Sequence, residues 1–425
     1  MKKKLSVLLA LVCLTTLLTF CLSSCGSNPV EYKSGSYRYI EAPDGVIITE
    51  YIGEETDVTI PDTIRGMPVV GIGSSAFSHH ETIKSVTIPD SVVSIDSSVF
   101  SHCKALESVT LGSGIREIDF SVFSYCNLVK YNEYENGFYL GNEENPYLAF
   151  VSVKYKGAPT MTIHPDTVII CGSAFENCFA LSELIIPDGV KSIGAYALHY
   201  AKLKTLYIPK SVESIGFHIF WECNTIQNII VSDENPHFKS VDGSLFSRDG
   251  SRLIKYALGQ TASTYQVPDG TVTIETGAFE NAQHLIEVTL PDSLETIGNN
   301  AFQDCKNMSS VTLGNSLKTI ESGAFASCSS LTEIVIPDSV EALGGVVFGG
   351  CSKLESAVIG SGVKDMDYQI FARCDSLKEV TFRDPEGWRA KTMYMLFYKK
   401  PDLSDPERNA VYLTEDYCGY FWSKK

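Results

Sequence analysis

The chain has 425 residues and is acidic, with 51 aspartate and glutamate residues against 34 lysine and arginine residues. The formal net charge of −17 argues against binding to nucleic acid or to anionic lipid, since both need a basic surface. A chain of this length would ordinarily form two or three domains. The repeat described below instead predicts one elongated body over residues 58–382.

Residues 1–24 have the pattern of a bacterial lipoprotein signal peptide. Three lysines precede an uncharged apolar run over residues 5–22, which by itself fits either a signal peptide or a membrane helix. Ser23 and Ser24 stand directly before Cys25, and this resembles the lipobox at which a cysteine is lipidated and the chain is cut. We therefore predict an extracytoplasmic protein, anchored to the bacterial membrane through lipid on Cys25 and displayed at the cell surface.

The segments that follow the signal are predicted to be a tether and an end cap. Cleavage removes three lysines and no acidic residue, so the net charge of the mature chain would be −20. Residues 25–36 are short and polar enough for a lipidated tether. Residues 37–57 contain Pro43-Asp44-Gly45, a turn signal between apolar stretches, and are predicted to form an N-terminal capping hairpin.

Residues 58–382 carry an internal repeat of 23 residues, marked by an aromatic anchor. A repeat of this length predicts a solenoid, because one unit is too small to bury its own apolar face and must stack on its neighbours. The anchors are Phe77, Phe100, Phe123, Phe175, Leu198, Phe220, Phe279, Phe302, Phe325, Phe348 and Phe371.

Each unit is predicted to hold one short strand and one turn. Leu331, Ile334 and Ile336 have the L-x-x-L-x-L spacing that opens leucine-rich repeats, and their alternation predicts a strand that Pro337 ends. The anchor and the residue three places later would share one face of a short helical turn. The predicted fold is an α/β solenoid with short parallel strands on its concave face and short helical or irregular turns on the other.

Two stretches near residues 129–165 and 231–265 break the 23-residue count. Both contain an acidic-Asn-Pro signal, at Asn145 and at Asn235, and the second continues into Asp249-Gly250 between apolar stretches. Asp-Gly in such a setting is a strong hairpin signal. We predict hairpin-bearing insertions that the solenoid tolerates.

After residue 382 the repeat stops, and residues 383–425 are rich in tyrosine and tryptophan. The last turn of a solenoid would otherwise expose apolar core to water. We therefore predict an aromatic C-terminal cap.

The unit V-x-I-P-D-S-V-x-x-I-x-x-x-A-F-x-x-C-x-x-L covers nearly all of residues 46–382. It resembles the BspA-like leucine-rich repeat family of bacterial surface proteins, here in lipoprotein form. The resemblance implies extracellular display and binding to host proteins, other cells or surface glycans. It supplies no catalytic residues and no cofactor.

An enzyme that acts on polysaccharides is the alternative function. Glu287, Glu333 and Glu379 occupy one repeat position on the predicted concave strands, two turns apart, and paired carboxylates cleave glycosidic bonds. Ser310 and Ser356 stand between them, and the plainer interpretation is that serine separates stacked like charges. We therefore predict no catalytic site.

Histidine and cysteine residues allow one local metal hypothesis. His79 and His102 share one repeat position, and His80 and Cys103 share the next, so a His/Cys site is geometrically possible. The alternative is that His80 fills the cysteine position and the other two face solvent. We predict no metal site.

Ten cysteines would remain outside the cytoplasm after lipidation at Cys25, where disulfides are permitted. We favour reduced thiols, because buried cysteines behave as small hydrophobic residues. Cys418 in the aromatic tail is the exception to this placement. The cysteines that share the inward position after an anchor are Cys103, Cys126, Cys178, Cys223, Cys305, Cys328, Cys351 and Cys374.

The outward strand position offers a candidate binding surface. It reads threonine in most units, as expected of a solvated strand, but Ile185, Tyr207 and Ile230 are consecutive and apolar. Contiguous exposed apolar surface marks interaction sites, although a loop from an insertion could instead cover these side chains. The sequence therefore predicts a monomeric, non-catalytic surface protein that binds a host or bacterial protein or glycan.

Overall fold

The computed structural model describes residues 29–391 and 399–424. The predicted signal peptide and the predicted lipidation site, Cys25, lie outside the described residues. Within the described residues, no helix is long and apolar enough to cross a membrane. The chain divides into two compact units, a first with Met1–Glu176, Ile185–Leu198 and Ser211–Ile219, and a second with Asn177–Leu184, His199–Lys210 and Phe220–Lys425.

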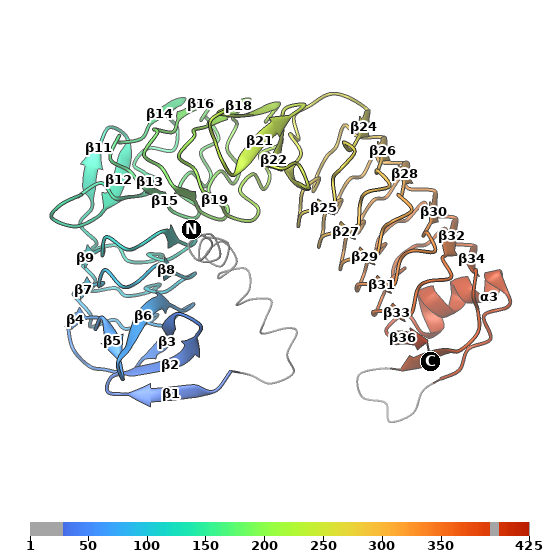
Figure 1. Cartoon of the computed structure of the whole chain (residues 1–425), viewed down its shortest axis with the longest axis horizontal. Helices are drawn as coiled ribbons and strands as arrows, with labels where there is room; N and C mark the ends of the chain where they lie inside the picture. Colours follow the sequence, from blue (N-terminus) through green and yellow to red (C-terminus); the bar gives the residue numbers. More distant parts are fainter. Residues whose placement is uncertain (1–28, 392–398, 425) are drawn as a thin grey trace, which may run out of the picture. The chain divides into compact units, whose positions relative to one another are not determined.

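Each repeat turn contains two short strands rather than the single strand that the sequence predicted. In the second unit, Glu333–Val335 pairs in parallel with Ser356–Ile359, and Ala342–Leu343 pairs in parallel with Asp365–Met366. Figure 1 shows these two sets of strands on opposite sides of the second unit. We call them the long-strand set and the short-strand set.

The long-strand set follows the L-x-x-L-x-L spacing and buries every second side chain. Its members are β4 (Asp57–Thr59), β7 (Ser85–Thr87), β9 (Ser108–Thr110), β14 (Thr160–Thr162), β16 (Glu183–Ile185), β18 (Thr205–Ile208), β20 (Asn228–Val231), β24 (Thr264–Gln266), β26 (Glu287–Thr289), β28 (Ser310–Thr312), β30 (Glu333–Val335), β32 (Ser356–Ile359) and β34 (Glu379–Phe382).

The short-strand set ends in the aliphatic residue that follows the Pro-Asp or Gly-Ser turn. Its members are β8 (Ser94–Ile95), β10 (Glu117–Ile118), β15 (Ile169–Ile170), β17 (Ser192–Ile193), β19 (Ser214–Ile215), β25 (Thr273–Ile274), β27 (Thr296–Ile297), β29 (Thr319–Ile320), β31 (Ala342–Leu343) and β33 (Asp365–Met366). The longer β6 (Met67–Ile72) pairs with β8 and with β5 (Thr63–Ile64).

Antiparallel three-stranded meanders begin each of the three short-strand sheets. In each meander the third strand pairs in parallel with the first repeat turn, as β3 with β6, β13 with β15, and β23 with β25. The two predicted insertions are therefore built like the start of the solenoid. The strands are β1 (Glu31–Ser34), β2 (Tyr37–Ala42), β3 (Gly45–Tyr51), β11 (Asn132–Tyr134), β12 (Gly137–Leu140), β13 (Ala149–Val153), β21 (Phe238–Val241), β22 (Ser244–Ser247) and β23 (Arg252–Lys255).

The anchor segment is an irregular turn and not a helix. Ser75 and His79, which flank Phe77 by two residues on either side, have φ values of 61° and 63°. A left-handed residue cannot continue a right-handed helix. The N–H of Phe77 instead donates to the carbonyl of Val99 in the next turn, at 3.0 Å. The anchor segments therefore form a third ladder of hydrogen bonds between turns.

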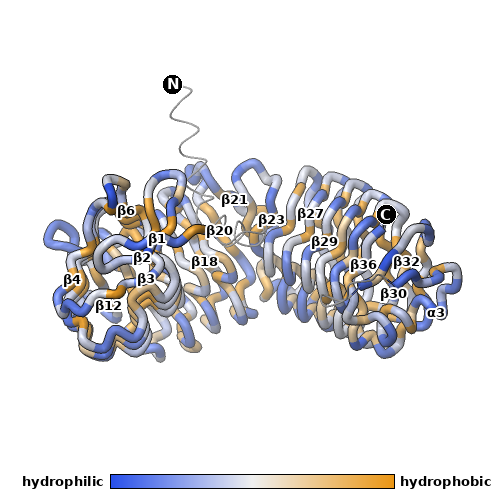
Figure 2. The backbone as a smooth tube through the Cα atoms, turned by 90° about the horizontal axis from the view of Figure 1, so that it is seen from below, coloured by the Kyte–Doolittle hydropathy of each residue, from blue (hydrophilic) through white to orange (hydrophobic). Residues whose placement is uncertain are grey.

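The anchor rings stack into a buried spine. In the second unit the ring centroids of Phe302 and Phe325 lie 5.1 Å apart, with an interplanar angle of 4°. Tyr256 extends this stack at 5.0 Å from Phe279, and in the first unit Tyr51 does the same at 4.9 Å from Phe77. Both tyrosines are buried, so they are anchors that counting phenylalanines misses. Figure 2 shows apolar and polar segments at the same places in successive turns of the second unit.

The inward cysteines hydrogen-bond the anchor backbone of the preceding turn. The thiol of Cys328 donates to the carbonyl of Phe302 at 3.1 Å, and Cys351 bonds Phe325 in the same way at 3.2 Å. Burial raises the pKa of Cys351 to about 12, so its thiol keeps the proton that it donates. Cysteine therefore suits this position as a small apolar residue that also satisfies a buried carbonyl.

Glycine replaces proline at some strand ends for a packing reason. A Cβ on Gly112 would lie 2.3 Å from the carbonyl oxygen of Pro89 in the preceding turn, so the backbone there leaves no room for a side chain. The carboxylate of Asp90 accepts a hydrogen bond from the N–H of Ser113 at 2.6 Å, and Asp338 does the same for Ser361 at 2.7 Å. A Pro-Asp turn thus supports the Gly-Ser turn wherever one follows it.

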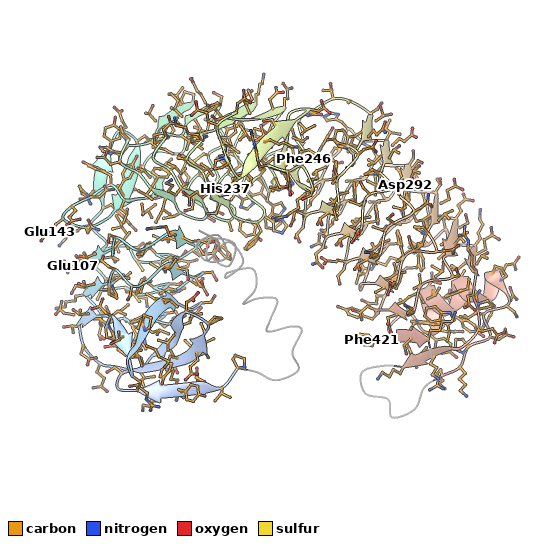
Figure 3. All side chains as sticks on the ribbon, in the orientation of Figure 1. Glu107, Glu143, His237, Phe246, Asp292 and Phe421 are labelled. Carbon is orange, nitrogen blue, oxygen red and sulfur yellow. The ribbon has the colours of Figure 1, made fainter. Side chains whose placement is uncertain are left out.

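Ion pairs link exposed side chains one turn apart. Lys130 Nζ lies 2.7 Å from a Glu107 carboxylate oxygen, and Lys378 Nζ lies 2.7 Å from Glu355. Figure 3 shows Glu107 at the edge of the first unit. Exposed pairs of this kind each contribute about 0 to 1 kcal/mol to stability. Their main effect is therefore to align neighbouring turns.

The aromatic C-terminal segment continues the sheet in an antiparallel direction. β36 (Phe421–Lys424) pairs with β33 and with β35 (Trp388–Lys391), and Figure 3 shows Phe421 on this strand. The helix α3 (Pro406–Val411) begins after Asp405, whose side chain caps it, and leads into the π-helical turn η1 (Tyr412–Asp416). Buried Asn409 in α3 donates to the carbonyl of Val380 at 2.8 Å, which satisfies an edge carbonyl of β34.

Candidate binding surface

The predicted apolar stripe is exposed on the long strands. Ile185, Tyr207 and Ile230 are 53%, 49% and 46% exposed. Tyr207 and Ile230 are direct partners across β18 and β20 in the second unit, so the structure brings these two side chains together. Ile185 is at the end of β16 and belongs to the first unit. The sequence left open whether a loop from an insertion covers this stripe. In the structure no loop buries any of the three side chains.

The Asn-Pro signal near this pair has a structural role. The side-chain amide of Asn235 donates to the carbonyl of Pro209 at 2.9 Å, and its oxygen accepts hydrogen bonds from the N–H groups of His237 and Phe238. Figure 3 marks His237 at the start of this meander. Because Asn235 is 1% exposed, it fixes where the third meander leaves the strands and is not available to a ligand.

The carboxylates considered for catalysis alternate with serine, as the sequence predicted. Glu333 and Glu379 pair with Ser356 from its two sides, on β30 and β34. Two strand spacings separate their backbones by about 10 Å, which is wider than the about 5 to 5.5 Å between the carboxyl groups of a retaining glycosidase and just above the about 6.5 to 9.5 Å of an inverting one. Glu287 on β26 pairs with Ser310 instead. This arrangement does not supply a close pair of carboxylates.

The histidines considered for metal binding stack instead of converging. The rings of His79 and His102 lie 4.5 Å apart and within 11° of parallel, and Tyr125 stacks on His102 at 4.3 Å. Zinc needs nitrogen lone pairs aimed at one point about 2.1 Å away, which two parallel rings cannot offer. Among the described residues, no group of three or more histidine, cysteine, aspartate or glutamate side chains is placed to hold a metal ion.

His80 occupies the cysteine position, which was the alternative to a His/Cys metal site. Its Nε2 lies 2.9 Å from the carbonyl oxygen of Tyr51, the anchor of the preceding turn. Cys103 makes the equivalent bond to Phe77 one turn later, at 3.1 Å. The imidazole therefore replaces the thiol as a partner for a buried carbonyl.

Sequence reasoning missed a row of exposed aromatic side chains in the second unit. Phe179, Tyr200 and Trp221 are 57%, 38% and 36% exposed, and His199 stacks between the last two. They follow the anchors of three consecutive turns by one to four residues. Reading the residues after each anchor as a column would have found them.

The repeat region matches the family described as BspA type leucine-rich repeat region over residues 53–143, 154–263 and 255–378, which is more than half of the chain. The chain belongs to this BspA-type family. The second match spans β21, β22 and β23, so the family pattern extends through the third meander.

Solved structures of similar chains have the same kind of fold. A leucine-rich cell surface protein from Faecalibacterium prausnitzii is 27% identical, with 85% of this chain and 97% of that chain covered and a TM-score of 0.53. The pneumococcal vaccine antigen PcpA is 24% identical over 84% of this chain and 88% of its own, with a TM-score of 0.52, which shows the fold alone. None of the curated proteins matches this BspA-type chain.

Proposed function

We propose that this chain is a non-catalytic, extracytoplasmic surface protein that binds a partner protein through the side chains of Tyr207 and Ile230. The observation that carries the proposal is an exposed apolar pair at a strand position where the other units mostly place threonine. Membership of the BspA-type family and likeness to a protein described as a cell surface protein support display outside the cell.

The chemistry of the pair favours a protein partner. Tyr207 offers a large apolar body with a polar hydroxyl, the profile that is enriched at the centres of protein interfaces. Ile230 lies directly beside it, and Thr205 and Asn228 supply polar groups on the same two strands. An apolar centre with a polar rim is the usual anatomy of such an interface.

Val335 provides a matched control for a test of this surface. It is 49% exposed, the same as Tyr207, and occupies the same strand position further along the second unit. An array of purified extracellular and cell-surface proteins is incubated with the wild-type chain and with the two variants. We expect Tyr207→Asp to abolish capture of the proteins that the wild type binds, and Val335→Asp to retain it.

Thermal unfolding separates binding from folding in this test. An exposed strand substitution shifts stability by about 0.5 kcal/mol or less, so both variants should melt close to the wild type. The proposal is wrong if the wild type captures no protein of the array, or if the two variants lose capture equally.

We also propose that Cys25 carries the lipid that holds the chain at the membrane. The support is the sequence pattern around Ser23 and Ser24. Intact-mass analysis of the membrane fraction should find a chain that begins at Cys25 with an added lipid mass. Cys25→Ser should leave the protein unprocessed or release it, and a native N-terminus elsewhere would contradict the proposal.

A further inference from the structure

The exposed aromatic row is continuous over three turns of the second unit. The ring centroids of Phe179 and Tyr200 lie 5.9 Å apart, those of Tyr200 and His199 lie 4.2 Å apart, and those of His199 and Trp221 lie 5.1 Å apart. The His199 and Trp221 rings are within 7° of parallel. Four flat rings therefore follow one another along the surface.

None of the four rings belongs to the buried core, which in the last of these turns contains Phe220 and Cys223, both 0% exposed. In later turns the positions one and two residues after the anchor hold small or polar residues, such as Gln303 and Asp304 after Phe302. The first unit has a shorter stack of His79, His102 and Tyr125 at the second of these positions. A contiguous exposed aromatic surface of this kind points to a ligand.

A polar frame is built on Glu222, the residue that follows Trp221. The two carboxylate oxygens of Glu222 each accept one amide hydrogen bond at 3.3 Å, from Asn224 in the same turn and from Asn281 in a later one. These bonds orient the carboxylate. Each amide group also keeps an acceptor oxygen and a second N–H, so the frame presents donors and acceptors together.

We propose that this row binds an uncharged oligosaccharide. The C–H groups of a sugar ring are apolar and pack against exposed aromatic side chains, while its hydroxyl groups need carboxylate and amide partners like those of Glu222, Asn224 and Asn281. The net charge of −17 disfavours anionic glycans. Three turns at about 4.8 Å each extend about 10 Å from first to last, which suits an oligosaccharide better than one sugar.

The site is separate from the Tyr207 and Ile230 pair, and the proposal does not depend on a protein partner at that pair. The test uses the full chain in native gels that contain hydroxyethylcellulose, soluble starch or galactomannan, all uncharged polymers. We expect at least one polymer to slow the wild type. Trp221→Ala and Tyr200→Ala should weaken that polymer's binding about tenfold, because a stacking surface is lost.

Two controls keep the result specific. Tyr155→Ala removes a tyrosine that is 69% exposed in the first unit, and it should bind the polymer like the wild type. Trp221→Phe keeps an aromatic ring and should restore most of the binding that Trp221→Ala loses. All variants are compared by thermal unfolding, so that a misfolded chain is recognised.

The proposal is overturned if none of the three polymers slows the wild type, or if Trp221→Ala and Tyr200→Ala bind as the wild type does. It is also overturned if anionic dextran sulfate binds more tightly than every uncharged polymer. Loss of a captured protein in Trp221→Ala, without retardation of the wild type by any polymer, would assign the row to a protein partner instead.

Discussion

The two units treat one buried acidic position differently. Four residues before the anchor, the second unit alternates acids with glycine from turn to turn, in the order Glu275, Gly298, Glu321, Gly344 and Asp367. The first unit places Asp96 and Asp119 there in consecutive turns, with no glycine between them. Like charges that stack directly in neighbouring strands are destabilising. At this repeat position, the second unit therefore separates its acidic residues with glycine, whereas the first unit stacks two of them directly.

The protonation of these acids reflects that difference. Burial, together with the smaller effect of the charge of Asp119, raises the pKa of Asp96 to about 6. Burial also raises the pKa of Glu321, but the N–H and side-chain amide of Asn299 donate to its carboxylate at 3.0 and 2.7 Å. A repeat can therefore hold a partly buried acid when the neighbouring turns give it space and donors.

The largest expected effect is common to both units and tests whether their spines are equivalent. Phe325→Ala in the second unit and Phe100→Ala in the first should each cost about 3 to 5 kcal/mol, the usual range for a buried phenylalanine. Hydrogen exchange of the neighbouring turns is the measurement, because solenoids open in segments. A much smaller cost in one unit would mean that its spine is less tightly packed.

The acidic column is expected to give the next largest effect, and it differs between the units. Because the folded pKa of Asp96 lies above its unfolded value near 3.8, its ionisation costs stability, and that cost grows as pH rises from about 4 to about 6. Asp96→Asn should remove this cost and stabilise the chain at pH 7 by on the order of 2 kcal/mol. Melting of the wild type and the variant at pH 5 and pH 7.5 measures it.

Two outcomes bear on that interpretation. The difference in melting temperature between the wild type and Asp96→Asn should be smaller at pH 5, where the aspartate is largely protonated. A difference that does not depend on pH would show that packing, and not charge, causes it.

A smaller effect is expected from the cysteine positions. Cys328→Ala leaves the carbonyl of Phe302 without its thiol donor, and Cys126→Ala does the same for Phe100. Each carbonyl keeps a backbone donor, the N–H of Cys305 or of Cys103, so each variant should cost about 0.5 to 1.5 kcal/mol, the net value of one hydrogen bond. Denaturant unfolding of the two variants checks this. Serine at either position, which restores a donor, should recover part of the loss.

The smallest effect should come from the exposed strand face. Thr312→Ala on β28 should change stability by about 0.5 kcal/mol or less, since its side chain is exposed. The measurement is the same hydrogen exchange used for Phe325→Ala. Equal losses at the two positions would mean that the inward and outward faces have been assigned the wrong way round.

The sequence alone predicted the period, the long strands and most of the anchors, and it left the exposure of the apolar stripe open. The first three follow from apolar spacing, which is local and repeats many times. It missed the short strands, because two residues such as Ala342 and Leu343 are too few to show an alternation. It also missed Tyr51 and Tyr256 as anchors, because only phenylalanine was counted, although Tyr256 lies 23 residues before Phe279.

Of the helical and irregular forms predicted for the anchor turn, the structure has the irregular one. Spacing of three residues suits a helix, but Ser75 and His79 are held in left-handed conformations by hydrogen bonds to the next turn, which sequence spacing does not reveal. The aromatic row was overlooked because its members take different offsets from their anchors. Only the fold brings Phe179, Tyr200 and Trp221 into one line.

The three meanders give the chain three starting points for assembly. A meander joins strands that are neighbours in sequence through short loops, so it closes with little loss of chain entropy. Its last strand then offers an unpaired edge, such as that of β23 before β25 pairs with it, and each later turn adds to the edge before it. Each of the three short-strand sheets thus grows from its own meander during synthesis. Loss of one meander would stop the assembly of only those turns that pair with it.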